Sequence, residues 1–227
     1  MGSLLAHIAE PSPYAPPVQG WRDDANGGDG GNQFKAAVFI SPWAFMQRPG
    51  AMLAADDRWD YLSREQGGRF QDAWAPKVDD VWANLCGSSH EGEERVWGRV
   101  FGRNGQMALV KKTLVTVGTA EVLLDSCRKF GRECVGAKTM VLDRTTDIVA
   151  VEREMQEKDA VTVECVGEAH VQPALDAALG YKEGVMMRVI LSWLSMFGEK
   201  QYLCKMGAEQ EMDASMLEGE YTFIDRT

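Results

Sequence analysis

The sequence predicts an α+β domain made mainly of antiparallel β-strands, with two or three helices packed on a sheet that curls towards a pseudo-barrel. Three observations predict this class. Asn104-Gly105 supplies the residue pair that a tight hairpin turn needs. Residues 161–165 alternate apolar and polar side chains with period two. Most β-rich runs are joined by short polar connections rather than by long helices, which favours antiparallel pairing over a βαβ array.

The first half of the chain begins with a short strand. AAVFI at 36–40 is β-rich, and a helix is expected at 56–66, where aspartates at the start suit the positive end of the helix dipole. A second helix is expected at 78–87, where apolar residues share one face and Gly87 is a suitable C-cap. The run 95–117 then predicts the hairpin.

Two elements follow with clear boundaries. Residues 119–131 predict a helix, because Thr119 can N-cap it and Gly131 can stop it, with basic residues in the last turn. Residues 137–143 predict a strand.

The stretch TTDIVAVEREMQEKDAVTVECVGEAHVQP at 145–173 is either one acidic helix or two strands joined by a charged connection. The period-two pattern at 161–165 favours the second interpretation, with 148–152 as its partner strand. A short helix is then expected at 174–180, before a further strand at 184–193.

The domain organisation follows from composition. Residues 1–33 are rich in proline and glycine and predict a flexible arm, in which Tyr14 and Trp21 can anchor a partner. Residues 34–227 are expected to form a single globular domain, of which 34–118 is either an integral part or a separate or inserted unit.

Charge and cysteine content narrow the function classes. The net charge is −10 and there is no compensating basic stripe, which argues against a nucleic-acid partner. The most apolar run, 185–197, is too short to span a bilayer and contains Arg188. Five cysteines without a C-x-x-C pair predict free thiols in a reducing intracellular compartment, either the cytoplasm or an organelle stroma or matrix. Their spacing to histidine matches no usual zinc pattern, so no metal and no cofactor are expected.

Catalytic motifs are absent from the sequence, which contains no GxSxG, HExxH or GxGxxG. Glu168 and His170 are the one acid–base pair worth inspecting, since residues i and i+2 of a strand share a face. Cys134, close to Arg132, is a second reactive candidate. A structural role is the commoner explanation for each of these side chains.

The order of segments AKTMVLD, TTDIVAVERE, DAVTVECVGEAHVQP and GYKEGVMMRVI resembles the central part of the LON substrate-binding domain, the N-terminal domain of Lon proteases. The resemblance covers about residues 119–193. His170 stands where that family often has arginine. The matching positions, in family order, are Val151-Glu152-Arg153, the turn Glu157-Lys158-Asp159, Gly167, Val171 and Tyr181.

This resemblance implies a PUA-like pseudo-barrel and a non-catalytic module that binds a protein or an unfolded polypeptide, or docks to a larger assembly. Two alternatives stay open. One is an accessory structural subunit of a large complex, anchored through the N-terminal arm. The other is a small-molecule enzyme that uses Glu168 and His170. The expected binding residues are Tyr14, Trp21, Glu168, His170 and Tyr181.

Overall fold

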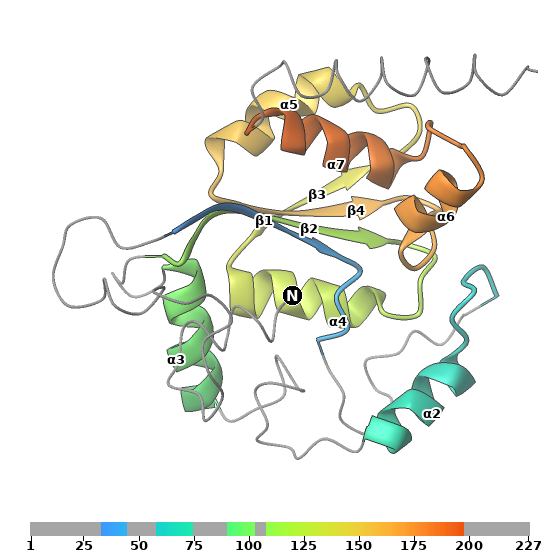
Figure 1. Ribbon diagram of the computed structural model, residues 1–227, viewed down its shortest axis with the longest axis horizontal. Coiled ribbons are helices and arrows are strands. Elements are labelled where there is room, and N and C mark those ends of the chain that lie inside the picture. The colour runs from blue at the N-terminus through green and yellow to red at the C-terminus, as the bar shows by residue number, and fades with distance from the viewer. Residues whose placement is uncertain (1–32, 45–57, 75–89, 103–107, 198–227) are drawn as a thin grey trace, which may run out of the picture.

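The described part of the chain forms an α/β structure around one parallel sheet (Figure 1). The computed structural model describes residues 33–44, 58–74, 90–102 and 108–197. The sheet has four strands in the order β1-β2-β4-β3. The strands are β1 (Phe34–Ile40), β2 (Val110–Gly118), β3 (Lys138–Leu142) and β4 (Ala160–Cys165).

The expected antiparallel sheet and pseudo-barrel are therefore wrong. Every pair of neighbouring strands is parallel, with Leu114 paired to Val38 on one side and to Val161 on the other. Parallel neighbours need a crossover between them, and helices supply it. The strands expected at 36–40, 137–143 and 161–165 are confirmed, but their directions are not.

The helices cover both faces of the sheet (Figure 1). One face carries α3 (His90–Phe101) and α4 (Leu124–Lys129), which continues into the π-helical turn η3 (Phe130–Val135). The other face carries α5 (Ile148–Glu157) and α7 (Val185–Ser195). Connections that step along the sheet in opposite directions thus run over opposite faces, as right-handed crossovers require. Near the carboxyl ends of the strands lie α2 (Arg64–Trp74) and α6 (Gln172–Ala178).

Two segments predicted as strands are helices. Residues 148–152 begin α5, where the Asp147 carboxylate caps the helix by accepting a hydrogen bond from Val149 N at 3.0 Å. Residues 184–193 fall in α7, which follows Gly184. Both segments are rich in β-branched residues, and burial on one helical face outweighed that propensity.

The predicted hairpin at 95–117 is also wrong. Its first half lies in α3, and its second half is β2, whose register partner is β1. Asn104-Gly105 lies outside the described residues. The helix expected at 119–131 is present in part, as α4 and η3, whereas the short helix after Pro173 is confirmed as α6. The helix expected at 56–66 begins later, at Arg64.

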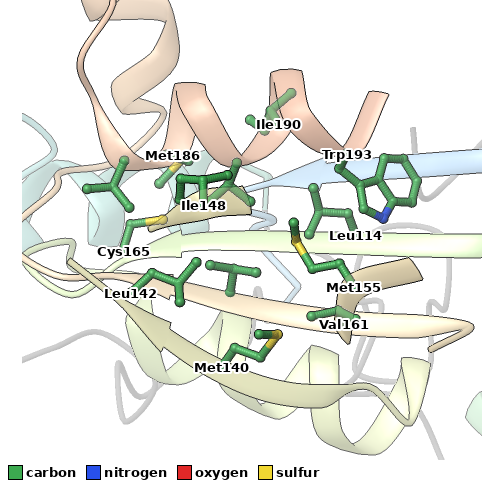
Figure 2. Packing of buried hydrophobic residues seen from close by; sticks show 13 residues of the cluster. Leu114, Met140, Leu142, Ile148, Met155, Val161, Cys165, Met186, Ile190 and Trp193 are labelled. Carbon is green, nitrogen blue, oxygen red and sulfur yellow. The ribbon is translucent and has the colours of Figure 1, made fainter. Parts of the chain in front are cut away.

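The larger hydrophobic core fills the space between the sheet and the pair α5 and α7 (Figure 2). Leu114 from β2, Val161 from β4 and Trp193 from α7 are buried together, with Met155 of α5 beside them. On the opposite face, Val115 joins a second core in which Phe130 meets Phe39 edge to face at a centroid distance of 5.2 Å. Adjacent residues of β2 therefore support opposite layers, as strand geometry requires.

The expected division into an arm at 1–33 and one domain at 34–227 stays a prediction, because the described residues do not include 1–32, 45–57, 75–89, 103–107 and 198–227. Those ranges contain several expected features: the arm residues Tyr14 and Trp21, the helix at 78–87, and the thiols of Cys86 and Cys204. Within the described residues, no helix is long and apolar enough to cross a membrane.

Candidate functional site

The carboxyl ends of β2 and β4 form a topological switch point. The chain leaves β2 towards α4 on one face, and it leaves β4 towards α6 and α7 on the other (Figure 1). In open parallel sheets, ligands bind outside the carboxyl ends of strands at such a point. The loops that begin after Gly118 and Cys165 are therefore the first place to look for a site.

These two loops are held tightly against each other. Thr119 N donates to Cys165 O and Ala120 N donates to Glu168 O, each at 3.0 Å. The Thr119 hydroxyl accepts from Gly167 N at 2.9 Å. A Cβ atom on Gly118 would lie 2.5 Å from the carbonyl carbon of Glu168 and closer still to its oxygen. Only glycine at position 118 allows the loops to approach this closely.

Asp60 joins a third segment to the two loops. Its Oδ1 accepts from His170 N at 3.1 Å and from Leu62 N at 3.3 Å, and its Oδ2 accepts from Val122 N at 2.8 Å. One carboxylate therefore links the segment before α2 to the loops after β2 and β4. Three stretches far apart in sequence are fixed around the same point.

At that point Glu121 faces His170. The side chain of Glu121 is wholly buried, and its Oε2 lies 3.5 Å from His170 Nδ1. Neither of these two atoms has a hydrogen-bond partner in the described structure. The other carboxylate oxygen of Glu121 is 3.5 Å from the thiol of Cys127. The thiol's pKa is well above its usual range, first because of burial and then because of the Glu121 charge.

The imidazole of His170 has one buried edge and one open edge. Nδ1 is buried against Glu121, while 16% of the side chain as a whole remains exposed. Nε2, unlike Nδ1, is not a buried nitrogen without a hydrogen-bond partner, and we call its side of the ring the open edge. A histidine held at Nδ1 by a carboxylate presents Nε2 for proton exchange, as in hydrolase triads.

Tyr61 lies beside the His170 ring. Its ring centroid is 5.8 Å from that of His170, and about half of the side chain is exposed. The pKa of the Tyr61 phenol is raised, first by burial and then by the charges of Asp60 and Glu121. The two carboxylates are therefore close enough to act on the Tyr61 phenol.

Glu168 has a different position from the one expected. It does not share a strand face with His170, because both residues lie in the loop after β4. Its carboxylate accepts from Val185 N at 2.5 Å and from Met186 N at 2.8 Å, and so caps α7. Burial raises the pKa of Glu168, and the two N–H donors partly offset that effect. Glu168 is a structural cap, and Glu121 is the carboxylate next to the histidine.

The remaining expected site residues are not brought to this point. Tyr181 lies beyond α6, where its N–H donates to Asp176 O at 2.8 Å. Cys134 is buried in the core beside Phe130. No group of three or more histidine, cysteine or acidic side chains in the described ranges is arranged to hold a metal ion.

Glu121, Asp60 and Tyr61 were missed by sequence reasoning. Glu121 follows a strand whose parallel pairing the sequence does not reveal, so its place at a carboxyl edge could not be inferred. The signal that was available is the run VTVGTAE at 115–121, where a buried strand ends directly in small residues and an acid.

Comparison of the chain with protein-family models, curated proteins and solved structures finds no match. The fold and the site therefore define the class by themselves: a parallel α/β protein with a histidine beside a buried carboxylate at its switch point.

Proposed function

We propose that the protein is an enzyme that acts on a small molecule at the switch point, with His170 as the group that takes up and returns a proton. The observation that carries this proposal is the pairing of His170 Nδ1 with the buried carboxylate of Glu121 at 3.5 Å. Of the two residues in the acid–base alternative from sequence, His170 keeps its role and Glu121 replaces Glu168.

The chemistry follows from the burial of Glu121. A buried carboxylate without a full hydrogen bond is unfavourable unless a neighbouring group carries positive charge. His170 can provide that charge by accepting a proton at Nε2 from a hydroxyl, water or amine of the bound molecule. The resulting imidazolium is stabilised through Nδ1–H by Glu121, and the proton returns to the leaving group in a later step.

Asp60 supports this arrangement without reaching the reacting atoms. It binds the backbone N–H of His170, and so fixes the loop on which the imidazole is carried. It therefore acts as a positioning residue.

The first test is ¹⁵N NMR of the imidazole rings, with His170 assigned by its loss in His170→Asn. The chain has three histidines, so assignment is simple. We expect the neutral ring to carry its proton on Nδ1, and Glu121→Gln to shift that tautomer balance. A neutral ring protonated on Nε2 would contradict the proposal, because Nε2 would then be no base.

The second test is turnover. A panel of chromogenic esters, amides, glycosides and phosphoesters is assayed with wild type, His170→Asn, Glu121→Gln and the exposed control Glu157→Gln. We expect one class of substrate whose turnover falls at least about 100-fold in His170→Asn and less in Glu121→Gln. If every rate is the same in His170→Asn as in wild type, the enzyme proposal fails.

A second candidate function is the binding of a polypeptide, and exposed apolar side chains on and after α6 favour it. Leu179 is 82% exposed, and Tyr181 and Leu175 are 42% and 38% exposed. This candidate does not need the LON-like barrel that the fold has excluded. Fluorescence anisotropy of a labelled unfolded polypeptide tests it, with Leu179→Asp expected to weaken binding and Val149→Asp, on the exposed side of α5, as the matched control. No saturable binding at well above micromolar protein would reject it.

A further inference from the structure

We infer that the molecule bound at His170 carries a positive charge, as an ammonium or guanidinium group. This inference rests on the proposed function, whose site it shares, and it names the class of ligand that this site accepts. It is carried by the charges and aromatic surface around the open edge of the imidazole.

Two carboxylates act on this rim. Both charges that raise the pKa of Tyr61 come from acids, Asp60 and Glu121. The two oxygens of Asp60 accept hydrogen bonds from three backbone N–H groups, and its hydrogen-bond partners among the described residues include no basic side chain. Arg58, at the outer end of the same segment, is exposed and has interactions of its own.

The unpartnered oxygen of Glu121 points independently to a positive ligand. Its Oε2 is buried, and neither it nor the facing atom, His170 Nδ1, has a hydrogen bond within the part of the chain that the structure describes. Water cannot screen a charge on Glu121, because its side chain is wholly buried. A cation at the open edge of the ring compensates that charge, whereas an anion adds to it.

Aromatic surface is present on the same rim. The Tyr61 ring is half exposed and tilted by 48° to the imidazole plane, and Trp59, two residues before it, is 76% exposed. The faces of such rings attract ammonium and guanidinium groups. Tyr61 can therefore hold the cation from one side while the imidazole Nε2 accepts its N–H.

A helix N-terminus, which often binds an anion in an α/β protein, is here already bound by a side chain of the protein itself. The N-terminus of α7 would attract a phosphate or carboxylate, but the Glu168 carboxylate occupies it through Val185 N and Met186 N. The arginines nearest to Glu168 lie towards β3 and α7: Arg188 donates to Thr146 O at 3.2 Å, and Arg144 lowers the pKa of Glu168.

Three probes of matched shape test the inference: benzylammonium, benzyl alcohol and benzoate. Each is titrated into the full chain while the His170 ring is followed by NMR. We expect benzylammonium to bind at least tenfold more tightly than the other two and to shift the ring signals of His170. Tyr61→Ala should weaken benzylammonium several-fold, and Glu121→Gln should do so about tenfold while leaving benzyl alcohol unchanged. Glu157→Gln is the control and should change none of the three.

The outcomes separate this inference from the proposed function. Preferential binding of benzoate or benzyl alcohol, or no binding of any probe, overturns the inference. If turnover still depends on His170 in that case, the enzyme proposal stands alone. If benzylammonium binds as expected but the ring carries its proton on Nε2, the enzyme proposal fails and the cation site remains.

Discussion

The substitution Gly118→Ala should separate the two loops that build the site. Gly118 ends β2, and its φ angle is not in the left-handed region, so alanine is tolerated by the backbone itself. The new methyl would instead overlap the carbonyl group of Glu168, at 2.5 Å from its carbon and 3.0 Å from the carbonyl oxygen of Ala169. Both obstacles are backbone atoms, which cannot rotate away.

The magnitude has two parts. Overpacking of a buried site destabilises a protein by about 1–3 kcal/mol. If the loops separate, the hydrogen bonds from Thr119 N, Ala120 N and Gly167 N are weakened as well, at roughly 0.5–1.5 kcal/mol each. We therefore expect Gly118→Ala to lower the free energy of unfolding by about 3–5 kcal/mol, which is a large share of the ~5–15 kcal/mol of a typical domain.

Urea denaturation followed by circular dichroism measures this change. Gly68→Ala is the matched control, since it makes the same chemical change in α2, where no atom lies within 4 Å of the new Cβ. The control should stabilise the protein by about 0.5–1 kcal/mol, because alanine has the higher helix propensity. The two variants should thus move the midpoint in opposite directions.

A free energy of unfolding for Gly118→Ala within about 0.5 kcal/mol of wild type would refute the reasoning. It would mean that the loops after β2 and β4 do not meet at this distance. The placement of Glu121 and His170, which depends on those loops, would then be wrong as well.

Three further predictions concern the framework of the site. Leu114→Ala should destabilise the protein by about 2–5 kcal/mol by urea denaturation, because Leu114 is fully buried between the sheet and α7, while Leu191→Ala on the exposed side of α7 should have almost no effect. Arg128→Ala should lower the free energy of unfolding by about 1–3 kcal/mol, because the guanidinium donates two hydrogen bonds of 2.8 and 2.7 Å to Glu164 and its removal leaves that carboxylate buried without a partner. An unchanged midpoint of urea denaturation would contradict the role of the pair. Burial raises the pKa of Glu168, so the folded state holds the proton of this carboxyl group more tightly than the unfolded state does. The resulting contribution to stability is complete below the unfolded pKa of about 4.3, and it is lost as the pH rises through the folded pKa. The unfolding free energy of wild type minus that of Glu168→Gln, measured from pH 4 to 7, should therefore decline with rising pH. A difference that increases with pH would mean that the pKa of Glu168 is lowered in the folded state, not raised.

The sequence was sufficient to locate several strands but not to orient them. The alternation in 161–165 is visible without any structure, and β4 is found there. Parallel and antiparallel strands share that alternation, however, so the direction of pairing had to be inferred from the connections. The connections were misjudged because three of the helices, α3, α5 and α7, were taken wholly or partly for strands.

The misjudged helix α7 shows why. Its residues Val185, Met186, Val189, Ile190 and Trp193 are buried, which is a helical spacing of i, i+1, i+4, i+5 and i+8. That period was present in VMMRVILSW, but the β-branched composition was given more weight. In α5, the signal was the N-cap Asp147 before the apolar run.

The candidate site was found in part for a related reason. His170 could be selected from sequence because few histidines exist to choose from. Its partner Glu121 is 49 positions earlier in the numbering, and only the parallel pairing of β2 with β4 brings the two loops together. A contact of that kind depends on tertiary structure, and no local pattern predicts it.

The pairing of β1 with β2 affects how the chain is made. At the amino-terminal end of β1, Gln33 binds Ala108 O across 75 residues of sequence. During synthesis at ~5–20 residues per second, β1 leaves the ribosome several seconds before the strand that it pairs with. The segment FKAAVFI is apolar apart from Lys35, which is typical of segments that associate with other chains while unpaired. A nascent-chain chaperone would therefore protect this protein most in the interval before β2 emerges, when the apolar strand β1 has no partner.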